Sequence, residues 1–274
     1  MNENKLRIAL CQIRTELELD ETLSKAAAMV RQAAEGGAKI VCLPEMFSCP
    51  YARQYFRDFA SKGHEKVYAA MSDWARENHI MLVGGSVPEL DGDKLYNTCF
   101  VFDAEGALVA RHRKVHLFDI DMPGMRFSES RTFTPGDSVT VFDTPYGKMG
   151  CAVCFDVRFP ELFRAMSRRG AGVIFLPAQF NQKTGPMHWE LALRSRAVDN
   201  QVFIVGAAAA KYEGFSYECW GHSAVADPGG TIIASCDEKE QILFADLDLE
   251  RVQGVRNELP IMKSLRSDVY PVAE

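Results

Sequence analysis

An apolar strand, a helix and a second apolar strand follow one another at the start of the chain, and this order constrains the fold most. The run "LRIALCQI" (6–13) has the character of a strand. Four apolar residues then recur at helical spacing, namely Leu23, Ala27, Val30 and Ala34, and Gly36-Gly37 ends that helix. The next run, "AKIVCLP" (38–44), is continuously apolar, as fully buried strands are. A strand–helix–strand unit indicates an α/β protein, in which function commonly lies in the loop after a strand.

The rest of the chain continues this alternation. Asp20 or Thr22 suits the N-cap of the first helix. Further helices are expected near residues 64–78, 160–170 and 186–200. Strands are expected in "IMLVGGSV", "KLYNTCFVFD", "ALVARHRKVHL", "VTVFDTP", "KMGCAVC", "GVIFLP" and "VFIVGAAAA", and in 219–226, 230–235 and 241–248. This pattern predicts a mixed sheet layered by helices, but periodicity alone leaves open whether there are one or two sheets. No linker or repeat interrupts it, so we expect one domain over residues 1–274.

Charge and hydropathy argue against several classes of partner. The formal net charge is −6, which argues against nucleic acid or an anionic membrane because neither would be attracted. No run approaches the ~20 apolar residues of a membrane span, and the polar start "MNEN" is unlike a signal peptide. Eight cysteines are scattered, several inside apolar runs, as reduced buried thiols are. We therefore expect a cytoplasmic protein.

Cys151 and Cys154, in "GCAVCFDVRFPEL", allow two interpretations. They are either a redox or metal-binding pair, or one nucleophile beside one packing residue. A zinc site needs about four ligands, and the chain has no second C-x-x-C. Cys151 lies in a strand pattern, so the two side chains would point to opposite faces if the strand continued. Cys154 lies where a strand gives way to a helix, and the helix N-terminus there would lower the pKa of its thiol and favour thiolate. A structural role for Cys154 also remains open.

Glu45 and Lys114 are the other two candidates of interest. Glu45 follows the buried strand 38–44, where an unpaired charge is costly, so it serves either as a functional carboxylate or as a turn or capping residue. Lys114 ends the strand "RHRKVHL" and could equally be an ordinary solvated lysine.

Three motifs together resolve these alternatives. "LPEMF", "RKVHLFD" and "CFDVRFPEL" resemble, in the family's order, the motifs of the nitrilase (carbon–nitrogen hydrolase) superfamily, and the resemblance runs from about residue 6 to residue 270. It implies an α-β-β-α sandwich, commonly a homodimer formed through helical faces. It also implies a catalytic triad of Glu45, Lys114 and Cys154, with Cys151 left as a packing residue. A second family glutamate matches Glu129 in "FSESRTFTPGD", at a spacing that varies across the family.

The resemblance also implies the role of each residue. Glu45 is expected as general base and Cys154 as the nucleophile that forms a thioester. Lys114 and the backbone N–H of Phe155 would stabilise the oxyanion, while Glu129 would hold Lys114 and help position the amide. No metal and no organic cofactor is implied.

Further segments resemble the omega-amidase branch, whose members deaminate ω-amides of short dicarboxylates such as 2-oxoglutaramate, 2-oxosuccinamate and succinamate. These are "HLFDIDMPG", "FDTPYGK", "TGPMHWELALRSRAVDNQ", "WGHSAVADP" and "RSDVY". Gln179 departs from that branch, which usually has a small residue there, so exact substrate choice stays open. Alternatives are a deaminated-glutathione amidase, an N-carbamoyl amine hydrolase, a true nitrilase, or a catalytically silent binding module.

A dicarboxylate monoamide also requires a cation for its free carboxylate. Arg158 is the candidate, although an ion pair with Asp156 or Glu161 would explain it equally well. Three aromatic residues are expected to wall the pocket or to serve as core, namely Tyr51, Phe118 and Phe180. Residues 116–130 are long for a structureless connection and are interpreted either as a mobile lid or as a plain surface loop.

Overall fold

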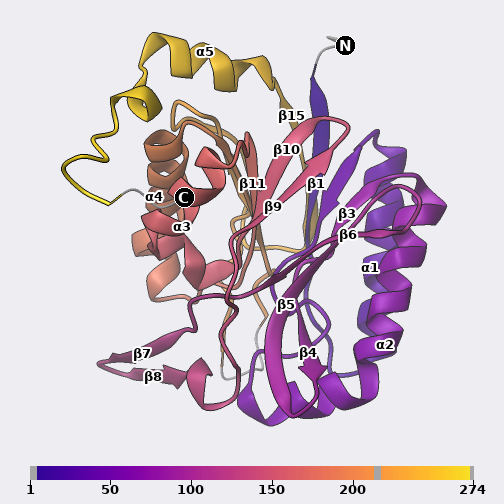
Figure 1. The fold of residues 1–274 in the computed structure, drawn as a ribbon. Helices are drawn as coiled ribbons and strands as arrows, with labels where there is room; N and C mark the ends of the chain where they lie inside the picture. The colour runs from indigo at the N-terminus through magenta and orange to yellow at the C-terminus, as the bar shows by residue number, and fades with distance from the viewer. Residues whose placement is uncertain (1–4, 213–216, 272–274) are drawn as a thin grey trace.

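The computed structural model describes residues 5–212 and 217–271. Two β-sheets pack face to face, and helices cover the outer face of each (Figure 1). Among the described residues, the first sheet has the order β15-β1-β2-β3-β5-β4, with β6 paired to β5. Its strands are β1 (Leu6–Gln12), β2 (Ile40–Cys42), β3 (Met81–Val83), β4 (Val87–Asp91), β5 (Lys94–Phe102), β6 (Leu108–Arg113) and β15 (Gln241–Leu247).

The second sheet runs β14-β13-β12-β11-β10-β9. Its strands are β9 (Thr140–Thr144), β10 (Gly147–Cys151), β11 (Val173–Ala178), β12 (Phe203–Ala208), β13 (Ala224–Ala226) and β14 (Ile232–Ser235). In both sheets the central strands that follow helices are parallel, because each helix returns the chain to the end of the sheet where the previous strand began. The strands of hairpins are antiparallel.

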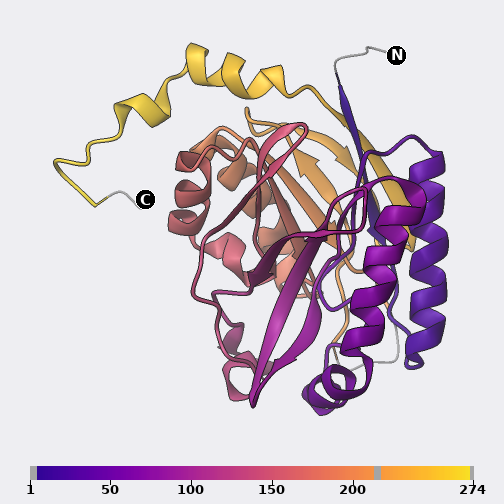
Figure 2. The ribbon, with the colours of Figure 1, turned by 45° about the vertical axis from the view of Figure 1, so that its right-hand side comes forward.

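Helices form the two outer layers. The first sheet is covered by α1 (Leu19–Glu35) and α2 (Arg53–Asn78), and the second by α3 (Pro160–Arg168) and α4 (Thr184–Asn200). After β15, helix α5 (Glu250–Glu258) and the 3-10 turn η3 (Ile261–Ser264) lead into a C-terminal arm that extends past the α3 and α4 side (Figure 2). The expected α-β-β-α sandwich is confirmed.

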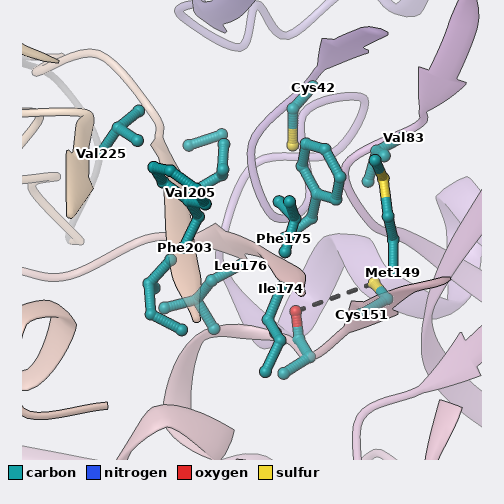
Figure 3. Close-up of a cluster of buried hydrophobic side chains, with 14 of the residues drawn as sticks. Cys42, Val83, Met149, Cys151, Ile174, Phe175, Leu176, Phe203, Val205 and Val225 are labelled. Atoms are coloured by element: carbon teal, nitrogen blue, oxygen red, sulfur yellow. Dashed lines mark hydrogen bonds between the residues drawn. The ribbon is translucent and has the colours of Figure 1, made fainter. Parts of the chain in front are cut away.

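The largest buried cluster lies between the sheets. Figure 3 shows Cys42 and Val83 of the first sheet facing Phe175, Met149 and Cys151 of the second. Cys151 is fully buried among these apolar side chains, and its thiol donates a long hydrogen bond to the carbonyl of Ala152. Cys151 is therefore a packing residue, and a hydrogen bond with Cys99, followed by burial, raises the pKa of its thiol.

Two helix starts differ from expectation. Helix α1 has Glu18 at its N-cap with no side-chain cap, so the assignment of Asp20 or Thr22 to that position is wrong. The Thr22 hydroxyl instead accepts a hydrogen bond from the backbone N–H of Glu16. Helix α2 begins at Arg53 rather than near residue 64, because Phe56 and Ala60 continue its buried face toward the N-terminus.

Residues 116–130 contain regular structure. Strands β7 (Asp119–Met122) and β8 (Met125–Ser128) form a hairpin, followed by the 3-10 turn η1 (Glu129–Arg131). The hairpin projects from the body of the molecule (Figure 1). Its mobility as a lid stays a prediction. Separately, none of the helices in the described ranges is both long enough and apolar enough to cross a membrane.

Candidate active site

Glu45 lies directly beyond the end of β2 and is completely buried. Its Oε1 accepts hydrogen bonds from Lys114 Nζ at 2.9 Å and from Asn97 Nδ2 at 2.8 Å, and its Oε2 accepts one from the backbone N–H of Gln179 at 3.0 Å. Burial raises the pKa of Glu45, the positive charge of Lys114 offsets this only in part, and the charge of Glu129 adds to the rise. A carboxyl group with a raised pKa is suited to exchange protons near neutral pH.

Lys114 follows β6 and is also completely buried. Its ammonium group lies between two carboxylates, 2.9 Å from Glu45 Oε1 and 2.9 Å from Glu129 Oε2. Burial alone would lower the pKa of Lys114, but the charges of Glu129 and Glu45 outweigh burial and raise it. Lys114 is therefore a fixed cation, and the solvated-lysine alternative is wrong.

Glu129 opens η1 after the β7–β8 hairpin and is buried. Besides Lys114, its carboxylate accepts hydrogen bonds from the hydroxyl of Tyr51 at 2.9 Å and from the backbone N–H of Phe118 at 2.6 Å. Its position is fixed from three sides, so it can hold the ammonium group of Lys114 in one place.

Cys154 begins the 3-10 turn η2 (Cys154–Arg158) and has a left-handed φ of 46°. A non-glycine residue in this region is strained, as nucleophiles on sharp strand-to-helix turns are. Burial and the negative charge of Glu45 raise the pKa of the Cys154 thiol well above its ordinary value, despite opposing contributions from Lys114 and the N–H of Gln179. The expectation that the helix terminus lowers this pKa is therefore wrong, because burial and a carboxylate outweigh it. A protonated thiol requires a base to become a nucleophile, and the carboxyl group hydrogen-bonded to this thiol is that of Glu45.

A small cavity opens at Cys154. Besides Cys154, its lining among the described residues contains four of the predicted pocket residues, Gln179, which the sequence marked as bearing on substrate choice, and two residues that the sequence did not single out. The lining is Phe118, Cys154, Phe155, Arg158, Gln179, Phe180, Thr184 and Tyr217. Tyr51 does not line this cavity. Its ring packs against that of Tyr217, with 4.7 Å between the ring centroids, and its hydroxyl donates a hydrogen bond to Glu129. Its predicted direct contact with substrate gains no support from this position.

Arg158 carries the positive charge of the cavity. Its guanidinium lies over the rings of Phe155 and Phe180 and is 3.3 Å from His188 Nδ1. None of the ion pairs found in the described part of the chain involves Arg158, and burial lowers its pKa. The alternative of an ion pair with Asp156 or Glu161 is thus not supported by the geometry.

Asp156 has a structural role in place of an ion pair with Arg158, and the sequence analysis did not predict it. It is completely buried, and its carboxylate is hydrogen-bonded to His112 Nε2, to His116 Nδ1 and to the backbone N–H groups of His116 and Val153. Burial alone would raise the pKa of Asp156, but the hydrogen bonds from the two histidines hold it well below its usual range. Because His112 and His116 flank Lys114 in sequence, Asp156 ties the lysine strand to the turn that carries Cys154.

Within the described residues, no group of three or more His, Cys, Asp or Glu side chains is arranged to hold a metal ion. The groups gathered at Cys154 are a thiol, a carboxyl group with a raised pKa and a buried cation, which are the kinds of group that acyl transfer through a covalent intermediate uses.

The fold is matched by comparison with known proteins. The model of the carbon–nitrogen hydrolase family matches residues 7–257, and the chain belongs to that family. It is 46% identical over 267 residues to omega-amidase NIT2 of Mus musculus, covering 97% of each chain. The structure resembles Saccharomyces cerevisiae Nit3, of the nitrilase superfamily, with a TM-score of 0.89, 40% identity and coverage of 96% and 97% of the two chains.

A third similar protein is an amidase from Nesterenkonia sp. AN1, solved as a mutant in which acrylamide has added to the active-site cysteine. Its TM-score is 0.78 at 27% identity, with 93% of this chain and 98% of that chain covered.

Proposed function

We propose that this protein is an omega-amidase, an enzyme that hydrolyses the terminal amide of a short dicarboxylic acid monoamide such as 2-oxoglutaramate, 2-oxosuccinamate or succinamate. The observation that carries the proposal is one small cavity with Cys154 at its base and Arg158 in its wall. The similarity to omega-amidase NIT2 over nearly the whole chain supports the same activity.

In the reaction we propose, Glu45 accepts the proton of the Cys154 thiol while the sulfur attacks the amide carbon. The new C–S bond shifts the carbonyl electrons to oxygen, and Lys114 with the N–H of Phe155 stabilises that oxyanion. Collapse of the intermediate breaks the C–N bond, and the proton held by Glu45 moves to nitrogen, which leaves as ammonia. A water molecule, losing a proton to Glu45, then attacks the thioester, and the thiol leaves with that proton. The buried carboxylates support these roles because they keep Lys114 charged.

Arg158 would bind the distal carboxylate through two parallel hydrogen bonds. Its position on the aromatic wall supports this role, since the guanidinium has no acidic partner within the described ranges and shares the cavity with Cys154.

The test is ammonia release from a panel of succinamate, 2-oxoglutaramate, deaminated glutathione, carbamoyl amines, nitriles and an uncharged short amide. The two ω-monoamides should have the highest kcat/KM. In Arg158→Gln, kcat/KM should fall roughly 10- to 100-fold on the charged monoamides and change little on the uncharged amide. Equal losses on both substrate types would place the carboxylate site elsewhere, and preference for another panel member would reject the omega-amidase assignment.

We further propose that the chain acts as one domain, as a homodimer, in the cytoplasm. The outer face of α4 supports dimer formation, because it leaves large apolar side chains exposed at Met187, Leu191 and Val198. Sedimentation velocity should give the mass of a dimer, and Leu191→Glu should shift it toward the monomer. A monomer in the unaltered protein would reject this assembly.

A further inference from the structure

The main chain directly after Glu45 is strained. Met46 has a left-handed φ of 50° and is completely buried. A non-glycine residue in this conformation costs about 1–2 kcal/mol and persists only where the surroundings determine it. The surrounding contacts therefore indicate what holds the general base in position.

The peptide unit between Glu45 and Met46 is held at both ends by side chains. Its carbonyl oxygen, on Glu45, accepts a hydrogen bond from Gln179 Nε2 at 2.5 Å. Its N–H, on Met46, donates to Ser86 Oγ at 3.1 Å. Both side chains are buried, so neither bond competes with bulk water.

The two side chains come from different sheets. Ser86 lies between β3 and β4 of the first sheet, and its own N–H donates to the carbonyl of Pro44 at 3.1 Å. Gln179 follows β11 of the second sheet, and its carbonyl accepts a hydrogen bond from the Tyr217 hydroxyl at 2.6 Å. The backbone N–H of Gln179 also reaches Glu45 Oε2 at 3.0 Å. The strained turn is thus fixed to both halves of the sandwich.

We propose that Ser86 and Gln179 are positioning residues that clamp the Glu45–Met46 peptide unit and thereby aim the Glu45 carboxylate at Cys154. The inference rests on the role of Glu45 given under the proposed function. Releasing either end lets the peptide unit rotate and Met46 relax, which moves the carboxylate away from the thiol. Displacements of about 1 Å in a catalytic group cost up to roughly 100-fold in rate.

The variants are Ser86→Ala and Gln179→Met, singly and together; methionine keeps the length of the glutamine side chain and removes its donor. Two remote variants are matched controls. Gln201→Met removes a buried amide that donates to the carbonyls of Val255 and Leu259, and Ser167→Ala removes a buried hydroxyl that donates to the carbonyl of Asn200. All should unfold at somewhat lower urea concentration than the unaltered protein.

Measurements of kcat should distinguish the clamp variants, at Ser86 and Gln179, from the two controls. Each clamp variant should lose roughly 10- to 100-fold in kcat on succinamate with little change in KM, whereas the controls keep kcat. The double variant should lose less than the product of the two single losses, because releasing one end already frees the peptide unit.

A substrate-independent measurement is the pH dependence of Cys154 alkylation by iodoacetamide, followed by mass spectrometry, with Glu45→Gln as the reference. The clamp variants should lose the base-assisted reaction at neutral pH and approach the reference, while the controls follow the unaltered protein. Clamp variants that match the controls in kcat and alkylation would overturn the proposal. If the unaltered protein releases no ammonia from any ω-monoamide, the proposed function fails, while the alkylation profiles still test the clamp.

Discussion

Replacing Asp156 by asparagine tests how two parts of the site are joined. These are the end of β6, which leads into Lys114, and the turn η2, which begins at Cys154. The two carboxylate oxygens divide the donors between them: Oδ1 accepts from the N–H and the ring of His116, and Oδ2 accepts from the ring of His112 and the N–H of Val153. An asparagine must place its NH2 group where one of these oxygens was. In either orientation, the NH2 group faces a main-chain N–H, of His116 or of Val153, and two donors cannot bond.

The expected loss of stability follows from the number of buried main-chain donors that Asp156→Asn leaves without an acceptor. One orphaned, buried main-chain donor costs about 1–3 kcal/mol, and the remaining bonds lose the contribution of the negative charge, so Asp156→Asn should lower the free energy of unfolding by about 2–4 kcal/mol. Urea denaturation at pH 7 measures this difference. Asp143→Asn is the control, because the Asp143 side chain is 84% exposed and its loss should change stability by less than about 0.5 kcal/mol.

The pH dependence supplies a second check. The pKa of Asp156 is lowered in the folded protein, so its stabilising contribution is fully present above the unfolded pKa of about 3.9 and is lost as pH falls toward the folded pKa. Asparagine does not titrate, so the stability gap between the two proteins should narrow below about pH 4. Equal urea midpoints at pH 7, or a gap that widens in acid, would refute the reasoning.

Three further predictions concern the reacting groups. Cys154→Ser should abolish turnover in a folded protein, whereas Cys151→Ala should keep most activity and lose about 1–2 kcal/mol of stability, so an inactive but folded Cys151→Ala contradicts the assignment of the nucleophile. Lys114→Met should lower kcat roughly 100- to 1000-fold, and a change confined to KM would mean that the lysine only binds substrate. Since the pKa of Glu45 is raised, kcat/KM should fall on the acid side at a pH above the ordinary glutamate value of about 4.3, and a rate that stays constant down to pH 4 would argue against Glu45 as the base.

Sequence reasoning predicted many of the helices and strands because their signals are local, but it did not predict α5 or the β7–β8 hairpin. The roles of the three motif residues came from the resemblance to the family and stay predictions. Glu45 stood out as a carboxylate at the end of an apolar strand, and the segment order predicted which elements alternate. The start of α2 was missed because its first buried residues, Phe56 and Ala60, follow a loop with no capping signal, and the structure likewise shows no side-chain cap.

The remaining site residues depend on tertiary contacts that no local pattern encodes. Asn97 reaches Glu45 across 52 positions of sequence, and Tyr217 reaches Gln179 across 38. The pKa of Cys154 was predicted in the wrong direction because the turn was visible in the sequence, whereas the burial and the nearby carboxylate were not. Gln179 was noted as an unusual residue, yet its bond to the Glu45 carbonyl required the second sheet to be in place.

The pairing of β15 with β1 determines when during synthesis the first sheet can be completed. Strand β1 opens the chain and takes an antiparallel partner from Gln241–Leu247, more than two hundred residues later. Until that strand leaves the ribosome, β1 presents an unpaired edge and the first sheet lacks its last member, although Glu45, Lys114 and Cys154 have all been made. Pairing over such a separation is slow, because the loop-closure entropy is lost before the contacts form. A nascent chain therefore carries every reacting group for much of its synthesis without the completed scaffold that aligns them.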